Sequence, residues 1–137
     1  MPLISVVTNV NSSEIPADFL RKTSVLVARI LGKPSATIQV AVHAGQRVHF
    51  FDSERPAAFV HATIVDRDFD LEQRRAIAAE LTALVAEELK LDRKRLVLKF
   101  PHTTADSVAF DGLLLMDLAT AGGKQKGGNG RASKAKL

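Results

Sequence analysis

The second residue of the chain is a proline, and its nitrogen could act as a base. A small penultimate residue allows the initiator methionine to be removed, which would leave Pro2 with a free secondary amine. An ordinary α-amine has a pKa of about 8, and burial or a neighbouring cation lowers the pKa of an amine. Pro2 is therefore a candidate general base near neutral pH, held in one direction by its ring. The alternative is that Met-Pro is a common start to a chain and has no chemical role.

Other residues that could do chemistry are few. The chain has no cysteine, which excludes disulfides, thiolate metal ligands and cysteine nucleophiles. Its histidines share no ligand spacing such as i, i+4, so we expect no metal site; they are His43, His49, His61 and His102. The glycine-rich stretch lies near the C-terminal end and not between a strand and a helix. We therefore expect no phosphate-binding loop and no cofactor.

The charge of the chain is concentrated in its last segment. A length of 137 residues suits one domain with a single core, and the net charge is +4. Residues 119–137 hold five basic residues and no acidic one, which leaves the remainder with a net charge of about −1. That balance does not favour binding to nucleic acid. No apolar run is as long as a membrane span and no signal peptide precedes the first predicted strand, so we expect a cytosolic protein.

The segment 119–137 is rich in glycine and lysine and is predicted to be a disordered tail behind a domain of residues 1–118. Its last three residues, Ala-Lys-Leu, resemble a peroxisomal address. A plain solubilising tail is the alternative.

The first half of the sequence reads as strand, helix and strand. The apolar, β-branched residues 3–9 predict a buried strand. Ser12 or Ser13 could cap a helix that tolerates Pro16 in its first turn. Alternating residues 37–43 predict a second strand.

The second half repeats this order. Residues 57–65 predict a strand, and Asp70 with Gln73 forms a capping box for a helix that ends near Leu89. Residues 95–100 predict the last strand. The fold class is therefore α/β, with two tandem β-α-β units that form a four-stranded sheet and place both helices on one face.

The face of the sheet opposite the helices must be covered by something else. Ala58, Val60, Ala62 and Ile64 alternate along one predicted strand and are too apolar to leave in water. Because the sequence predicts no further helix, it favours self-association through other copies of the same sheet.

Several short segments have a joint spacing that is more specific than any one of them. They are Pro2, Thr8-Asn9-Val10, Pro16, Phe19-Leu20, Leu31-Gly32-Lys33-Pro34, Ser53-Glu54-Arg55-Pro56-Ala57, Leu89 to Phe100 and Val108-Ala109-Phe110-Asp111. Over residues 2–118 they resemble the macrophage migration inhibitory factor and D-dopachrome tautomerase family. The resemblance implies a homotrimer whose sheets surround a central barrel, with active sites at the subunit boundaries.

The resemblance also implies roles for individual residues. Pro2 would be the catalytic base, and Lys33 would lower the pKa of Pro2 and bind a carboxylate or enolate oxygen of the substrate. An aliphatic residue at the end of the third strand would contribute backbone contacts; it is Val65 without a gap and Ile64 with a gap of one residue. Phe110 corresponds to an aromatic wall of the pocket.

Each of these residues has a plainer interpretation. Lys33 follows a helix end, where a lysine can satisfy the last carbonyl groups, and Phe110 could be ordinary packing. Two polar substrate contacts of the family are replaced by Val97 and Lys99, as in its D-dopachrome branch, and Lys99 could hold a carboxylate. The Cys-x-x-Cys motif of the family is absent.

Together these expectations predict a cofactor-free keto–enol tautomerase of the phenylpyruvate or dopachrome type. Its substrate would be a small aromatic keto or enol carboxylate. The alternative is a cytokine-like protein that binds a cell-surface receptor and retains vestigial tautomerase activity. The family allows export without a signal peptide, while the tail allows a peroxisomal location.

Overall fold

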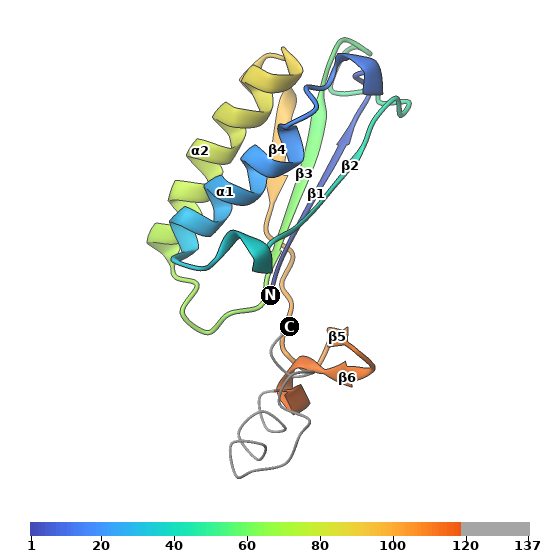
Figure 1. The fold of residues 1–137 in the computed structure, drawn as a ribbon. Helices are drawn as coiled ribbons and strands as arrows, with labels where there is room; N and C mark the ends of the chain where they lie inside the picture. The colour runs from blue at the N-terminus through green and yellow to red at the C-terminus, as the bar shows by residue number, and fades with distance from the viewer. Residues whose placement is uncertain (119–137) are drawn as a thin grey trace. The chain divides into compact units, whose positions relative to one another are not determined.

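Two helices cover one face of a four-stranded sheet (Figure 1). The computed structural model describes residues 1–118, and contacts divide the chain into units 1–101 and 102 onward, which are treated separately below. The first unit contains β1 (Pro2–Thr8), α1 (Phe19–Leu31), β2 (Gln39–His43), β3 (Ala58–Ile64), α2 (Leu71–Leu89) and β4 (Leu96–Lys99), with short 3-10 turns η1 (Ser12–Glu14), η2 (Ser35–Thr37) and η3 (Arg93–Arg95).

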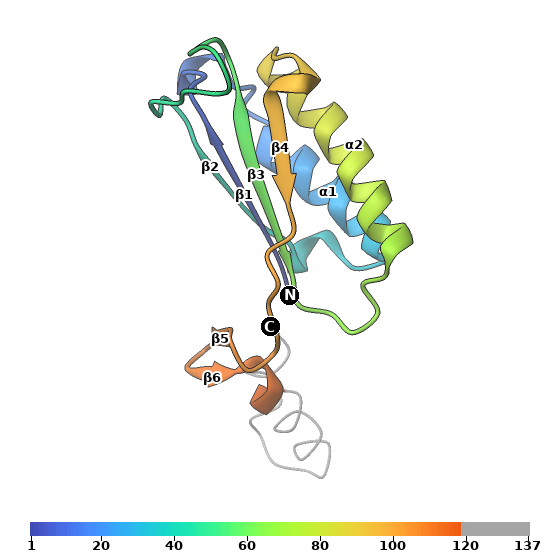
Figure 2. The same cartoon turned by 180° about the vertical axis from the view of Figure 1, so that it is seen from behind.

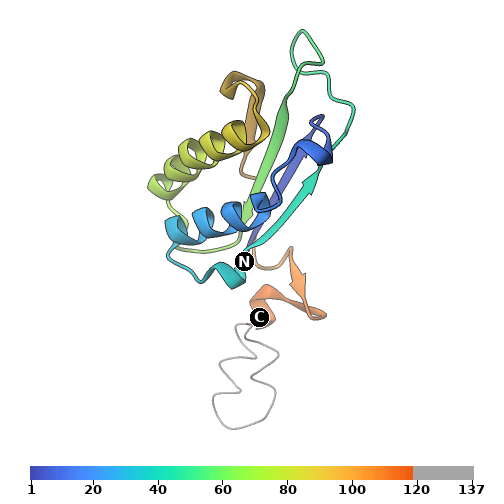
Figure 3. The same ribbon diagram turned by 45° about the horizontal axis from the view of Figure 1, so that its top comes forward.

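The strand order is β2-β1-β3-β4, and the two halves of the unit meet at the centre of the sheet. β1 pairs with β2 in parallel, β3 pairs with β4 in parallel, and β1 pairs with β3 in the antiparallel direction. Each parallel pair is joined by a crossover that contains one helix, and Figures 2 and 3 show both helices on the same side. The prediction of two tandem β-α-β units with both helices on one face is confirmed.

The predicted start of the first helix is wrong. Residues 12–14 form the separate turn η1, and α1 begins only at Phe19, after an N-cap residue, Asp18, whose side chain makes no capping hydrogen bond. The physical reason is Pro16, because a residue that precedes proline is driven into extended backbone, and Ile15 has φ −92° and ψ 125°. A helix that began at residue 12 or 13 could not pass through Ile15. The predicted capping box of α2, by contrast, is present in full between Asp70 and Gln73.

The apolar residues expected to face other copies of the chain lie instead beneath the helices. Ala58, Val60, Ala62 and Ile64 are all buried within the single chain and belong to its main core. Strand alternation shows which residues share a face but not which face the helices cover, and that second step was wrong. The other side of the sheet, here called the open face, carries Leu3, Ser5, Val7, Gln39, Ala41, His43, Phe59, His61, Thr63, Val97 and Lys99.

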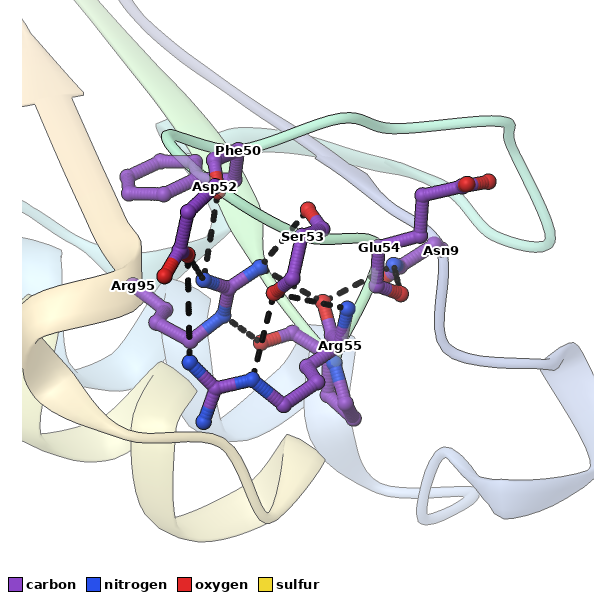
Figure 4. A network of polar contacts seen from close by, with 8 residues as sticks. Asn9, Phe50, Asp52, Ser53, Glu54, Arg55 and Arg95 are labelled. Atoms are coloured by element: carbon purple, nitrogen blue, oxygen red, sulfur yellow. Dashed lines mark hydrogen bonds and ion pairs between the residues drawn. The ribbon is translucent and has the colours of Figure 1, made fainter.

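A buried arginine holds the segment that leads into β3 (Figure 4). The guanidinium group of Arg95 donates hydrogen bonds to the carbonyl oxygens of Phe50, Ser53, Arg55 and Pro56 at 3.0 to 3.2 Å. The Arg95 side chain is 7% exposed, and its nearest carboxylate, that of the exposed Asp52, lies 3.7 Å away. Most of the desolvation of this charge is therefore offset by backbone dipoles rather than by an anion.

A second anchor comes from β1. The side chain of Asn9 donates to the carbonyl oxygens of Glu54 and Arg55 and accepts from the N–H of Ala57. The hydroxyl of Thr8 donates to the carbonyl oxygen of Ala57 at 2.7 Å. The backbone just before β3 is thus fixed from both neighbouring strands.

The second unit contains a small hairpin. β5 (Ala109–Phe110) pairs in the antiparallel direction with β6 (Leu113–Leu114), and Asp111 and Gly112 form the turn with φ of 53° and 78°. Two consecutive positive φ angles characterise the type I′ turn, for which Asp-Gly is a favoured pair. The predicted tail, residues 119–137, lies outside the described residues, and the single domain over 1–118 stays a prediction. Within residues 1–118, no helix is both long and apolar enough to span a bilayer.

We predict that Arg95→Ala lowers the free energy of unfolding by about 3 kcal/mol, because four carbonyl groups lose a charged donor. Chemical denaturation at one protein concentration measures this change. Arg93→Ala is the matched control, since Arg93 is exposed in the same turn, and it should cost less than about 0.5 kcal/mol. Equal effects of the two substitutions would contradict the anchoring role.

Candidate active site at the first residue of the sheet

The N terminus of the chain is part of the sheet. Pro2 is the first residue of β1, its side chain is almost completely buried, and it is paired with Ile64 at the end of β3. One residue earlier, the Met1 amino group donates to the carbonyl oxygen of Val65 at 3.0 Å, and the Val65 N–H donates to the Met1 carbonyl oxygen at 3.4 Å. The pairing with β3 therefore holds the terminal residues in one position.

Lys33 is directed to this end of the sheet by the way α1 terminates. Gly32 adopts the left-handed conformation, with φ 66°, and the Lys33 N–H donates back to the Ala28 carbonyl oxygen at 2.9 Å. A positive φ favours glycine at this position and turns the chain sharply out of the helix. Figure 1 shows the end of α1, the start of β1 and the loop after β3 at the same end of the sheet.

The Lys33 side chain meets an acidic residue there. Its Nζ lies 2.9 Å from Oδ2 of Asp66, in the loop after β3, and the two side chains are 33% and 18% exposed. Burial alone would raise the pKa of the Asp66 carboxyl, but the hydrogen bond from Lys33 and the positive charges of Lys33 and the N terminus lower it overall. Asp66 is therefore ionised at neutral pH.

The environment of the terminal amine favours its neutral form. Burial lowers the pKa of the Met1 amino group, the Lys33 charge lowers it further, and the Asp66 charge opposes both. An amine that loses its proton more readily than usual is suited to accept one from a substrate near neutral pH. The structure carries Met1, so Pro2 would take over this terminal position only after Met1 is removed.

The structure separates the two candidates at the end of β3. Ile64 is buried in the main core, so its side chain is occupied by packing beneath the helices. Val65 is half-buried, and both of its backbone polar groups point to Met1. Removal of Met1 would free the N–H and C=O of Val65 next to the new amine. This geometry favours Val65 over Ile64 as the residue that offers backbone contacts.

The remaining predicted residues lie elsewhere. Val97 and Lys99 are exposed on β4, on the open face, whereas Pro2 points to the helix-covered face. Within one chain the sheet separates them from Pro2. Phe110 is half-buried in β5 and belongs to the other unit. Pro2, Lys33, Ile64 and Val65 are thus the predicted site residues that the first unit gathers together.

Asp66 is the residue that the sequence interpretation missed. One signal could have found it: an antiparallel pairing of the first and third strands brings the residue after β3 to the first residue of β1. The sequence alone did not reveal which strands pair in that direction. Within residues 1–118, no group of three or more His, Cys, Asp or Glu side chains is arranged to hold a metal ion.

A shallow hollow of about 500 Å³ lies away from these residues. It is on the open face and is lined by side chains and backbone of the three strands β1, β2 and β3, among them Leu3, Gln39 and His61. It includes neither Pro2 nor Lys33. The candidate chemistry and this hollow are therefore on different faces of the sheet.

The fold and the site define a small α/β protein in which a β-α-β repeat carries a partly buried terminal amine near a lysine. The family model for macrophage migration inhibitory factor matches residues 1–116. A macrophage migration inhibitory factor homolog of Brugia malayi is 33% identical over 112 residues, covering 82% of this chain and 96% of that protein. Mouse D-dopachrome decarboxylase is 30% identical over 100 residues, covering 73% of this chain and 85% of that protein.

A solved structure agrees with these relatives. The macrophage migration inhibitory factor of Trichinella spiralis superposes with a TM-score of 0.75 at 28% identity, covering 81% of this chain and 97% of that one. The chain belongs to the macrophage migration inhibitory factor family, as its sequence predicts. Membership supports a function of the tautomerase or cytokine-like type in general.

We predict that Lys33→Met raises the pKa of the terminal amine, because a positive charge is lost and Asp66 is left unopposed. The pH dependence of labelling of the N-terminal peptide, read by mass spectrometry, measures this pKa. Lys22→Met is the matched control, because it removes the same charge from the exposed side of α1, where Lys22 pairs with Glu88. An unchanged amine pKa in Lys33→Met would contradict the arrangement.

Proposed function

We propose that this protein is a cofactor-independent keto–enol tautomerase, and that the amine of Pro2 is its general base once Met1 has been removed. The observation that carries the proposal is the terminal amine itself. In the chain that carries Met1, this amine is the Met1 amino group: strand pairing fixes it, and burial and the Lys33 charge lower its pKa. We propose the same environment for the Pro2 amine after Met1 is removed. A rigid amine whose pKa is lowered can remove a proton from the carbon next to a carbonyl group more readily than an ordinary amine.

Lys33 and Val65 supply the electrostatic part of the proposal. Proton removal places negative charge on the carbonyl oxygen, and an ammonium group or a backbone N–H stabilises that charge. Lys33 offers the ammonium group, and Val65 offers an N–H that Met1 occupies in the unprocessed chain. The Pro2 amine would then return the proton at the neighbouring position, which completes the tautomerisation without a cofactor.

The proposed substrate is a small aromatic keto or enol carboxylate of the phenylpyruvate or dopachrome type. A relative named D-dopachrome decarboxylase supports this class. Phe110 is proposed as an apolar wall of the pocket, and Val97 and Lys99 as further substrate contacts. Because Val97 and Lys99 lie across the sheet from Pro2 in one chain, their roles require a site built from more than one subunit.

A homotrimer would provide such shared sites. The open face supports this assembly, because it carries Leu3, Val7, Ala41 and Val97 on a side that neither α1 nor α2 covers. We predict a mass of three chains in light scattering at micromolar concentration.

Lys99→Gln should weaken phenylpyruvate binding several-fold and leave kcat nearly unchanged, because a remote charge contributes mainly to binding. A monomer with full activity would contradict shared sites.

A cytokine-like receptor-binding role is the second candidate. Its support is that several relatives are named as homologs of macrophage migration inhibitory factor, and that two polar contacts of the family are replaced at Val97 and Lys99. In that case the amine site would be vestigial, and a surface of the protein would engage a cell-surface receptor.

We predict that Pro2→Ala reduces the turnover of enol-phenylpyruvate at least about 100-fold, because a rigid secondary amine is replaced by a more mobile primary one. Ultraviolet absorbance follows the reaction, and intact mass establishes whether Met1 is present. A chain with one arginine inserted between Met1 and Pro2 is the companion variant, since it keeps Pro2 but acylates its nitrogen. It should be inactive.

The same proteins separate the two candidate functions. Full turnover with an acylated Pro2 would rule out the proposed base. A processed wild-type protein without turnover that still engages a receptor would favour the cytokine-like role.

A further inference from the structure

The side chain of Asp66 is fixed by contacts to both of its carboxylate oxygens. Its Oδ2 contacts Nζ of Lys33 at 2.9 Å, and its Oδ1 accepts the N–H of Asp68 at 3.1 Å. Its backbone carbonyl oxygen accepts the N–H of Phe69 at 3.2 Å. Both carboxylate oxygens are therefore engaged, and the side chain has one direction.

The charges around this pair come from three elements. The terminal amine belongs to β1, Lys33 follows α1, and Asp66 follows β3 together with the exposed Arg67 and Asp68. Of these groups, Lys33 and Asp66 act on the terminal amine, with opposite sign. Lys33, the cation proposed to bind the substrate, thus already has an anionic partner.

That partner has a consequence for any anion that enters the site. A carboxylate that binds Lys33 has to share the ammonium group with Asp66 or displace it. Because the pair is partly solvated, the exchange should cost about as much as an exposed ion pair, roughly a two- to five-fold change in binding.

We propose that Asp66 is a positioning residue of this site, which fixes the ammonium group of Lys33 and competes with the carboxylate of the substrate for it. The effect of Asp66 on turnover rests on the proposed function. Its effects on anion binding and on the pKa of the terminal amine can be measured without turnover. It makes Asp66 the residue that limits the affinity of this protein for carboxylates.

Asp66→Asn is the informative substitution. Asparagine keeps an oxygen that can accept from Lys33 or from the Asp68 N–H, and it removes the charge. Phenylacetate should then bind about two- to five-fold more tightly, whereas the neutral phenylacetamide should bind as before. Because a negative charge is lost, the pKa of the terminal amine should fall, and the acid limb of kcat/KM should move to lower pH.

Binding is read as protection of the terminal amine from labelling by phenylacetate or phenylacetamide, in the full-length protein at several pH values. Asp68→Asn is the matched control, because it removes the same charge from the same loop. It keeps the backbone N–H that donates to the Asp66 carboxylate. It should change neither the affinity for phenylacetate nor the amine pKa by a comparable amount.

The outcomes separate the two proposals. Tighter binding of phenylacetate alone, with a lower amine pKa, supports the role of Asp66 even if no protein turns over phenylpyruvate, in which case only the tautomerase proposal fails. Equal changes for phenylacetate and phenylacetamide, or no change for either, would overturn the role of Asp66. Turnover in the wild-type protein would then leave the tautomerase proposal standing.

Discussion

The pairing of residue 2 with the end of β3 is the constraint on which the site depends. Most chain termini are mobile, and a mobile amine would be solvated and would have an ordinary pKa. Here β1 begins at Pro2 and lies between β2 and β3, so the terminus is buried as a consequence of forming the centre of the sheet. The same pairing brings Val65 and Asp66 to the amine, because an antiparallel neighbour ends where β1 begins.

The register of that pairing is fixed far from the site. A slip of one residue would turn every side chain of β3 to the other face, replacing Ile64 by Val65 in the core. Arg95 and Asn9 prevent this slip by holding the backbone of residues 50–57 before β3 starts. A buried guanidinium group at one end of the sheet thus contributes to the position of a proton acceptor at the other.

How far the sequence could predict this molecule depended on whether a feature is local. The capping box at Asp70 and Gln73 and the order of strands and helices are encoded in neighbouring residues, and they were predicted correctly. The start of α1 was predicted incorrectly. Ser12 and Ser13 favour a helix cap, but Pro16 holds Ile15 in extended backbone, so the helix cannot begin there.

Non-local features were harder to derive. The face of β3 that meets the helices depends on how the crossovers pack, and alternation alone could not identify it. The ion pair between Lys33 and Asp66 joins the loops that follow α1 and β3. These loops are far apart in the sequence, so no residue spacing predicts the pair. Pro2 and Lys33 were predicted through a family resemblance, and without it a Met-Pro start would have carried little information.

The burial of Pro2 and the pairing of Met1 with Val65 also set a time limit on the removal of Met1. In the folded chain Pro2 is buried, and Met1 exchanges two hydrogen bonds with the backbone of Val65. An aminopeptidase therefore has little access to the Met1–Pro2 bond. β3 is synthesised some sixty residues after β1, which at 5 to 20 residues per second leaves the terminus unpaired for about 3 to 12 seconds. Removal of Met1, on which the proposed base depends, is therefore expected during translation, before the sheet closes over the terminus.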